Sequence, residues 1–405
     1  MMVRQLISAA IFSFLFICAN AQQPEPVYSF ATVLKPVSWY RQQADLWKKE
    51  IEKDPKNGGA WYNYYRANRN INRTDSTDSR NGKQRQEQEQ SIIEDMGKAI
   101  PDSYEYNLCR WMIAGNNYND LKYLKRAEEL GAGKTTHFAD VIVWGEIERN
   151  AERKFKYAAK WYESRTASPG LLYYNYNVLI GLKPNAIIFT AGDNDTYPLW
   201  LLQSQGIRKD VTVLNLSLLF IDEYRNKIFS ELGVLPWNME PASHSVNDKG
   251  LADDVEKGRK KETRYNTDIV KHVAANSKKH PVYVGLTVSD EYTIAIGEDL
   301  FLTGLAYEYS NKTIDNIAYL RHNFEQLYAL DYLDKRFFAD VSEYWVKMTN
   351  ANYVVPMVKL YEHYKESGEL AKAEAIKVKV LNMFKGEINK STCFITEEEV
   401  KKYFN

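Results

Sequence analysis

The sequence predicts an α/β core, built as a small parallel sheet within three layers, that is flanked by tetratricopeptide-like α-helical repeats. Three observations support this fold class. Two short apolar runs at 186–190 and 211–216 enclose a helix-like segment, which is the pattern of a parallel βαβ unit. Paired helical patterns rich in aromatic residues and alanine precede this unit. One similar helical hairpin follows it.

The composition allows a large folded protein and gives no support for a nucleic-acid partner. The chain has 405 residues, of which 44% are hydrophobic, and this length predicts two or three domains with substantial cores. Lysine and arginine together number 53, as do aspartate and glutamate, so the formal net charge is zero. A nucleic-acid-binding protein is expected to carry a basic surface instead.

The first 21 residues have the pattern of a cleaved signal peptide. Arg4 precedes an apolar run at 6–18, and Ala19-Asn20-Ala21 supplies the small residues of a cleavage site. This run is too short to anchor the chain in a membrane, and no other segment is apolar enough to span one. We therefore expect an exported, soluble protein that is periplasmic or associated with the outer membrane.

Residues 22–170 are expected to form a helical-repeat region. From residue 38 onward, aromatic and small residues recur at helical spacing, and Asp54-Pro55 separates the first two helices as in a tetratricopeptide junction. The stretch 70–90 differs because it is polar and has no apolar face. We interpret it as a mobile loop within the repeats.

The α/β domain is expected at 171–312, and a C-terminal helical region with one repeat-like hairpin at 313–405. An aromatic helix at 171–182 leads into the first strand of the βαβ unit. A third buried strand is predicted at 282–288, with a weaker fourth strand within 302–309. In the C-terminal hairpin, Gly368 lies at the turn between the two helices.

Polar residues gather where the predicted strands end, which is where open α/β sheets bind ligands. Asp193 and Asp195 follow the first strand, and their carboxylates could hold a divalent cation such as Mg²⁺ or Ca²⁺. A structural alternative is a tight turn at Asp193 or Asn194 with Asp195 or Thr196 capping the next helix. The candidate ligand-binding residues are Gly192, Asp193, Asn194, Asp195, Thr196, Asn215, Ser217 and Asp290.

Sharper enzyme signatures do not fit this segment. A haloacid-dehalogenase-type motif requires Thr or Val at the position that Tyr197 occupies. Asp193 and Asp195 match the Asp-x-Asp letters of a nucleotide-sugar transferase, but an exported protein has no obvious supply of nucleotide sugar. The chain also has no glycine-rich phosphate loop and no histidines at metal-ligand spacing.

The run Gly192-Asp193-Asn194-Asp195-Thr196, in its context at 185–200 and 210–219, resembles the soluble C-terminal region of bacterial protein O-mannosyltransferase-like membrane proteins. The segment 304–307 and the closing helical hairpin look similar in the same order. In that family a multispan membrane domain precedes this region, whereas this chain has a signal peptide and helical repeats. The resemblance therefore implies a shared fold and a shared partner or ligand, without implying sugar transfer.

These observations favour an exported binding or scaffold protein that uses its helical repeats for a protein or glycoprotein partner. The strand ends of the α/β core add a possible site for a small ligand or a cation. The alternative is an accessory subunit or enzyme of glycan or glycoprotein processing, with a metal held by Asp193 and Asp195.

Overall fold

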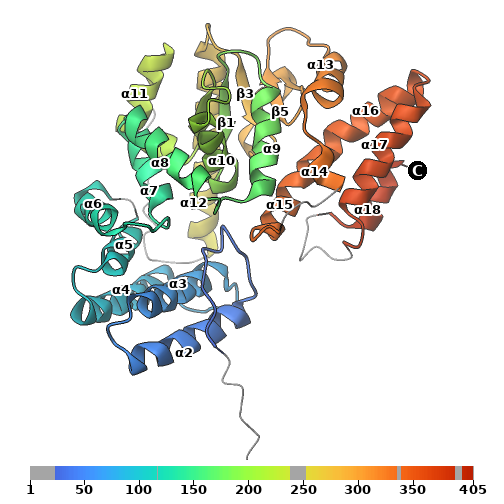
Figure 1. Ribbon diagram of the computed structural model, residues 1–405. Helices are drawn as coiled ribbons and strands as arrows, with labels where there is room; N and C mark the ends of the chain where they lie inside the picture. The colour runs from blue at the N-terminus through green and yellow to red at the C-terminus, as the bar shows by residue number, and fades with distance from the viewer. Residues whose placement is uncertain (1–22, 116, 238–251, 335–338, 388–394, 405) are drawn as a thin grey trace, which may run out of the picture.

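The computed structural model describes residues 23–115, 117–237, 252–334, 339–387 and 395–404, with only the backbone for 252–263 and for residue 295. The chain is 64% helical and contains a small mixed sheet of five strands (Figure 1). The predicted signal peptide at 1–21 lies outside the described residues. Within the described ranges, no helix combines the length and the apolar character needed to cross a membrane.

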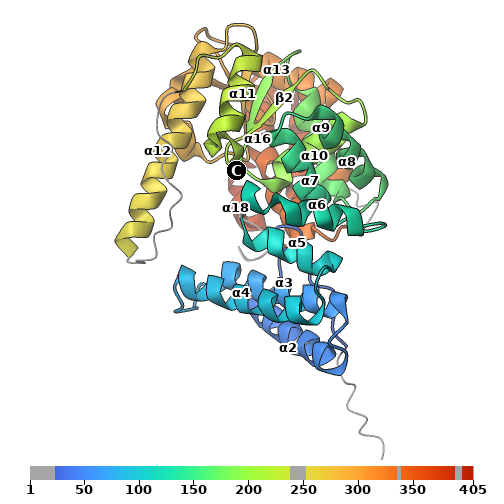
Figure 2. The ribbon, with the colours of Figure 1, turned by 90° about the vertical axis from the view of Figure 1, so that its left-hand side faces the viewer.

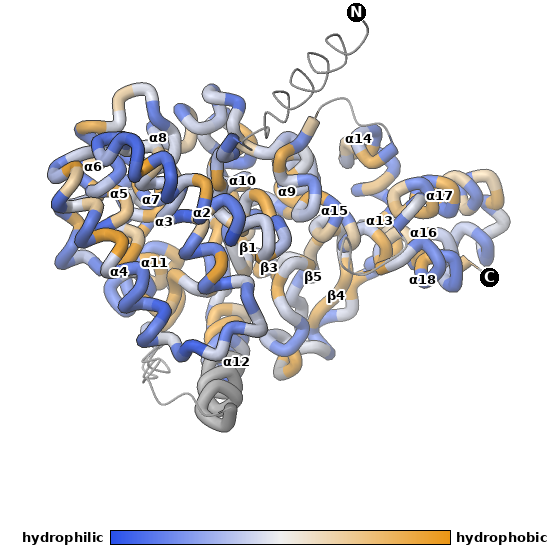
Figure 3. Tube along the Cα trace, turned by 90° about the horizontal axis from the view of Figure 1, so that it is seen from below, coloured by the Kyte–Doolittle hydropathy of each residue, from blue (hydrophilic) through white to orange (hydrophobic). Residues whose placement is uncertain are grey.

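Helices α2 to α8 form an N-terminal helical array that leads into the core. The first of them stack below the core, as Figure 2 shows for α2 to α5, and α8 packs against α10 of the core. The hydropathy trace in Figure 3 is largely hydrophilic along α2. The array consists of α2 (Val37–Lys53), α3 (Gly58–Thr74), α4 (Gly82–Ala99), α5 (Tyr104–Ile113), α6 (Leu121–Leu130), α7 (Phe138–Ile147) and α8 (Ala151–Glu163).

Local sequence explains how successive helices of the array begin and pair. The side chain of Asn57 caps α3 by accepting a hydrogen bond from the Ala60 backbone N–H (3.0 Å). Between α7 and α8 the two backbones approach so closely that a Cβ at Gly145 would lie 2.8 Å from the Lys154 backbone nitrogen. Only glycine fits at this contact.

The loop predicted at 70–90 is mostly helical, so this prediction was wrong. Helix α3 continues to Thr74, and α4 begins at Gly82 after a capping box between Asn81 and Gln84. The polar side chains bind one another rather than water alone: buried Glu89 accepts hydrogen bonds from Arg69 Nη1 (2.8 Å) and Asn72 Nδ2 (3.1 Å). The polar composition of residues 70–90 does not reveal that their side chains pair with one another, and for this reason it predicted a loop.

The sheet is built around β1, the first strand of the predicted βαβ unit. The strand order is β2-β1-β3-β5-β4, and β1 pairs in parallel with both β2 and β3. Helix α10 (Asp193–Ser204) connects β1 to β2. The strands are β1 (Ile187–Thr190), β2 (Thr212–Asn215), β3 (Val282–Gly285), β4 (Leu300–Leu302) and β5 (Ala306–Tyr309).

The sheet is not entirely parallel, which corrects the sequence-based expectation. Strand β5 runs antiparallel to β3, and β4 runs antiparallel to β5. Only short 3₁₀ turns and β4 lie between β3 and β5, whereas a parallel pair needs a longer crossover. The strands that carry the predicted site residues nevertheless belong to the parallel part of the sheet.

Helices cover both faces of the central strands. On one face, Ile188 and Val213 pack in a cluster with residues of α9 (Pro169–Ile180) and α10. On the other face, Phe189 and Leu214 pack against residues of α11 (Asp222–Leu232) and α12 (Ala252–Asn276). Every residue of β1 and β3 is buried, as expected for strands covered on both sides.

The C-terminal region is helical and packs beside the sheet (Figure 1). Its hairpin of α16 and α17 turns at Gly368, whose φ of 78° lies in the left-handed region that favours glycine. The region consists of α13 (Asn316–His322), α14 (Asp331–Asp334), α15 (Glu343–Asn350), α16 (Val354–Glu366), α17 (Leu370–Met383) and α18 (Glu397–Lys401).

Candidate functional site

Asp195 closes the junction between β1 and α10. Its two carboxylate oxygens accept hydrogen bonds from the backbone N–H groups of Ala191 and Gly192, each at 2.8 Å, and one oxygen also accepts the Thr287 hydroxyl. These N–H groups lie at the start of the helix and have no partner within it. Burial raises the pKa of Asp195, and the three hydrogen bonds oppose this effect. Helix α10 thus begins at Asp193, so Asp193 and Asn194 belong to its first turn rather than to a tight turn before it, and Asp195 caps the helix from its third position. Both oxygens of Asp195 are occupied.

Thr196 and Asn215 also join elements of the core. The Thr196 and Thr190 hydroxyls are 2.7 Å apart, and Asn215 Nδ2 donates to Thr196 Oγ1 (2.9 Å). All three residues are buried. This network connects the ends of β1 and β2 to the first turn of α10, so Thr196 and Asn215 orient the strand ends.

The remaining predicted residues are divided between different surroundings. Asn194 donates from Nδ2 to the Ala31 carbonyl (3.1 Å), which connects α10 to the N-terminal segment. Gly192 is half-buried, and Ser217 and Asp290 are exposed. Among the described residues, no hydrogen bond or ion pair joins Ser217 or Asp290 to Asp193 or Asp195. Hydrogen bonds thus join the first strand end and the start of α10 to Asn215.

Asp193 lies on the first turn of α10, near acidic and aromatic side chains of the core and of the helical array. Its side chain is exposed, yet protein atoms surround it closely enough for desolvation to be the main cause of its raised pKa. The carboxylates of Asp195 and Asp140 add to this effect, and the Tyr197 hydroxyl opposes it by a hydrogen bond. Together these neighbours raise the pKa of Asp193 to about 6.

Charge interactions connect Asp193 and Tyr197 of α10 to Asp140 of α7, and Asp140 to Tyr62 and Arg66 of α3. Asp140 of α7 accepts a hydrogen bond from Trp111 Nε1 (2.9 Å), and burial raises the pKa of Asp140 while Trp111 and nearby Arg66 lower it. Arg66 of α3 donates from Nη2 to the Tyr62 hydroxyl (3.0 Å). We use the name α10 recess for the cluster of Tyr62, Arg66, Asp140, Asp193 and Tyr197; all five are at least partly accessible to solvent.

Sequence reasoning identified Asp193 and missed the other four residues of the α10 recess. Three of them come from helices whose polar and aromatic residues were interpreted as repeat packing. One signal was available: Asp140 is the one acidic residue among the apolar residues at 138–144. An acidic side chain at such a position needs a partner or solvent.

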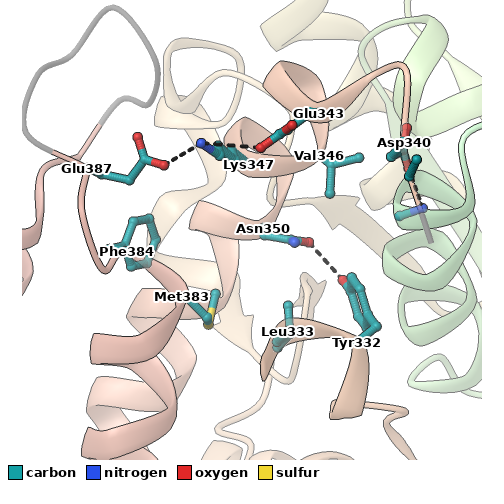
Figure 4. Close-up of a pocket in the computed structure, with 12 residues that line it drawn as sticks. Tyr332, Leu333, Asp340, Glu343, Val346, Lys347, Asn350, Met383, Phe384 and Glu387 are labelled. Carbon is teal, nitrogen blue, oxygen red and sulfur yellow. Dashed lines mark hydrogen bonds and ion pairs between the residues drawn. The ribbon is translucent and has the colours of Figure 1, made fainter. Parts of the chain in front are cut away.

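A cavity lies between α9 and the C-terminal helices, away from every predicted site residue. This cavity of about 280 Å³ is lined by Tyr332, Lys347 and Asn350, among others (Figure 4). The Lys347 ammonium lies 2.5 Å from a Glu387 oxygen, and the Tyr332 hydroxyl donates to Asn350 Oδ1 (2.7 Å). Its polar groups therefore largely satisfy one another.

The described residues contain no group of three or more His, Cys, Asp or Glu side chains arranged to hold a metal ion. Of the two predicted metal ligands, Asp193 is exposed and Asp195 is buried. Any ion at this position would need further oxygen ligands from water or a bound molecule, since hard cations take six or more.

Comparison with known proteins finds that part of this core is similar to one family model. Residues 173–231 match the model of TMEM260-associated domain 2. This segment runs from α9 to α11 and contains β1, β2 and Asp193. The TMEM260 family is related to protein O-mannosyltransferases. No curated protein and no solved structure matches the chain significantly.

Proposed function

We propose that this protein is an exported, periplasmic or outer-membrane-associated binding or scaffold protein. In this proposal the helical array consists of tetratricopeptide-like repeats and the α/β core is a three-layer domain. The array holds a segment of a protein or glycoprotein partner against the core. One observation carries the proposal: Asp193 and Tyr197 of the core lie close enough to Asp140 of the array for their charges to interact, and all three residues are at least partly accessible to solvent.

The chemistry of the α10 recess suits a polar polypeptide segment. Tyr62 and Tyr197 offer flat surfaces and hydroxyl groups, which are common at protein interfaces. Arg66 supplies donors, and Asp140 and Asp193 supply acceptors of opposite charge. No nucleic-acid partner is proposed, because the recess carries both charges and the whole chain has a net charge of zero.

Site-specific photo-crosslinking tests this proposal. A benzophenone amino acid at position 197 is expected to capture a partner in cells that express the full chain. The matched control carries it at Tyr162, an exposed aromatic residue on α8. Arg66→Glu should abolish the crosslink from position 197. Equal capture from positions 197 and 162, or capture unaffected by Arg66→Glu, would contradict the proposal.

A second candidate function is an accessory subunit or enzyme of glycan or glycoprotein processing. The match of 173–231 to a family related to protein O-mannosyltransferases favours it. The pKa of about 6 at Asp193 also suits a proton donor or acceptor near neutral pH. In this candidate function, Asp193 and Asp195 together hold a divalent cation.

Thermal unfolding distinguishes the metal-dependent candidate from the binding protein. A ligand that binds only the folded state must raise apparent stability. The second candidate expects millimolar Mg²⁺ or Ca²⁺ to raise the Tm, and Asp193→Asn to remove that rise. A Tm that neither ion changes would rule out the metal-dependent form while leaving the proposal of a partner-binding recess intact.

A further inference from the structure

The segment at 25–31, which we call the strap, crosses from the helical array to the core without forming a helix or strand before its turn at residue 30. Its backbone polar groups must still find partners, because unpaired buried groups are costly. Side chains of other elements supply these partners. The manner in which they do so points to a binding site for a peptide backbone.

Side chains from α2 and α3 hold the first half of the strap. Gln43 Oε1 accepts a hydrogen bond from the Glu25 N–H (2.7 Å), and Trp47 Nε1 donates to the Glu25 carbonyl (2.9 Å). Asn63 Oδ1 accepts from the Val27 N–H (2.7 Å). Both backbone groups of residue 25 are thus bound by one face of α2, since its two partners are four residues apart.

Asn70 binds two backbone groups farther along the strap. Its Nδ2 donates to the Tyr28 carbonyl (2.7 Å), and its Oδ1 accepts from the Phe30 N–H (3.3 Å). Asn63 and Asn70 are seven residues apart on α3, which is about 10.5 Å along a helix. Three residues of extended chain cover about the same distance. The spacing of the two asparagines therefore matches the repeat of an extended peptide.

The core holds the other end of the strap. Trp345 Nε1 of α15 donates to the Phe30 carbonyl (2.9 Å), and Asn194 Nδ2 of α10 donates to the Ala31 carbonyl (3.1 Å). The strap is thus bound by the helical array at one end and by the core at the other. The hydrogen bonds that connect the strap to these two regions use its backbone atoms and do not depend on the identity of its side chains.

Strap side chains contribute little to this binding. Tyr28 is 51% exposed, and the residues at positions 23, 25 and 26 are exposed as well. Val27, at 3% exposed, and half-buried Phe30 are the exceptions, and both pack in the cluster of Tyr40, Ala44 and Ala67. Backbone hydrogen bonds together with one apolar cluster are the features of a site that tolerates many peptide sequences.

We propose that α2 and α3, together with Asn194 and Trp345, form a peptide-binding site that recognises an extended backbone and is occupied by the chain's own residues 25–31. We call the side chains of Gln43, Trp47, Asn63, Asn70, Asn194 and Trp345 the backbone clamp. The ligand class is an extended peptide with a small apolar side chain at the Val27 position. This site is separate from the α10 recess and does not depend on the function proposed for it.

Cleaving the strap within the folded chain makes the clamp available for measurement. A site-specific protease sequence inserted between Leu34 and Lys35 allows the whole protein to fold before it is cut. We expect the released N-terminal piece to remain bound during size-exclusion chromatography. A fluorescent synthetic peptide of residues 23–34 should then replace it and saturate at one peptide per protein.

Peptide variants separate recognition of the backbone from recognition of side chains. N-methylation at both Val27 and Phe30 removes two donors and should weaken binding at least about tenfold. N-methylation at Tyr28 is the matched control, since its N–H donates to no clamp residue in the described structure. Tyr28→Ala should change affinity by less than about threefold, as expected for an exposed side chain. The proposal is overturned if the double N-methylation costs no more than the control or if Tyr28→Ala is equally damaging.

Two clamp variants provide an independent test on the protein side. Asn63→Asp keeps the oxygen that accepts the Val27 N–H, so the peptide should bind nearly as before. Asn70→Asp loses the donor to the Tyr28 carbonyl and places an anion beside it, so binding should fall at least about tenfold. Circular dichroism before cleavage confirms that each variant is folded. If Asn70→Asp folds and binds the peptide like the unaltered chain, the clamp is refuted whatever the outcome at the α10 recess.

Discussion

The β1–α10 junction and the α10 recess share the first turn of α10. The acidic side chain at the junction is buried and fully hydrogen-bonded, whereas the one in the recess is exposed and lies near other acidic groups. At the junction, Asp195 accepts hydrogen bonds from two N–H groups and a hydroxyl, and little of it reaches solvent. In the recess, Asp193 is exposed, and both carboxylates near it disfavour its charge. Two residues of the same type, two positions apart, therefore serve stability and binding respectively.

This comparison teaches that residue type and spacing do not separate the two roles. Fully satisfied polar groups stabilise the fold, whereas a group whose neighbours disfavour its charged state is a candidate for function. If the distinction is correct, substitutions at the junction should cost stability and those in the recess should not.

Asp195→Ala is expected to have the largest effect, a loss of about 2–4 kcal/mol in the free energy of unfolding. The substitution removes a helix cap and leaves the Ala191 and Gly192 N–H groups without their partner. Urea denaturation at neutral pH measures the loss. Asp195→Asn keeps one acceptor oxygen and should cost less. A loss below about 1 kcal/mol for the alanine variant would remove the distinction between junction and recess.

Thr196→Val is expected to cost about 1–3 kcal/mol, because it leaves a buried Thr190 hydroxyl and Asn215 amide without their shared partner. The double variant Thr190→Val with Thr196→Val should recover part of this loss, since replacing both hydroxyl partners leaves fewer unpaired groups. Urea denaturation of the single and double variants measures both values. Strictly additive losses would contradict a hydrogen-bonded network.

The sequence predicted the junction well because its determinants are local. Strand, turn and helix follow one another over 186–204, and the cap alternative for Asp195 needed no distant residue. It also predicted the parallel pairing of β1 and β2, which depends on the helix between them. The antiparallel β5 and the helix at 82–90 were missed, because both depend on partners that the local pattern does not reveal.

The recess could not be predicted in the same way. Tyr62, Asp140 and Asp193 are separated by more than fifty residues at each step and meet only because the array curves back toward the core. Hydrophobic periodicity reports which face of a helix is buried, not which distant helix lies opposite. The charge interactions among these residues therefore became apparent only in the folded chain.

Asp193→Asn is expected to raise stability at pH 7, by less than about 1 kcal/mol because solvent screens an exposed carboxyl. The pKa of Asp193 is raised from 3.8 to about 6 in the folded state, so folding binds protons between these values. Stability should therefore fall as pH rises through this range, and the cost is complete above pH 6. Thermal unfolding from pH 4 to pH 7 should show a shallower fall for Asp193→Asn. An unchanged slope would mean that Asp193 titrates normally.

Tyr197→Phe is expected to have the smallest effect, confined to the titration of Asp193. The Tyr197 hydroxyl donates to that carboxylate and lowers its pKa, so its removal should raise the pKa further. Carbon-13 NMR of the aspartate carboxyl groups measures the change, with Tyr162→Phe as a control outside the recess. Stability should hardly change, because the aromatic ring and its packing against Trp161 and Trp200 are kept. A lower pKa for Asp193 in the variant, or a large loss of stability, would contradict this prediction and would mean that Tyr197 stabilises the fold, as the residues of the junction do.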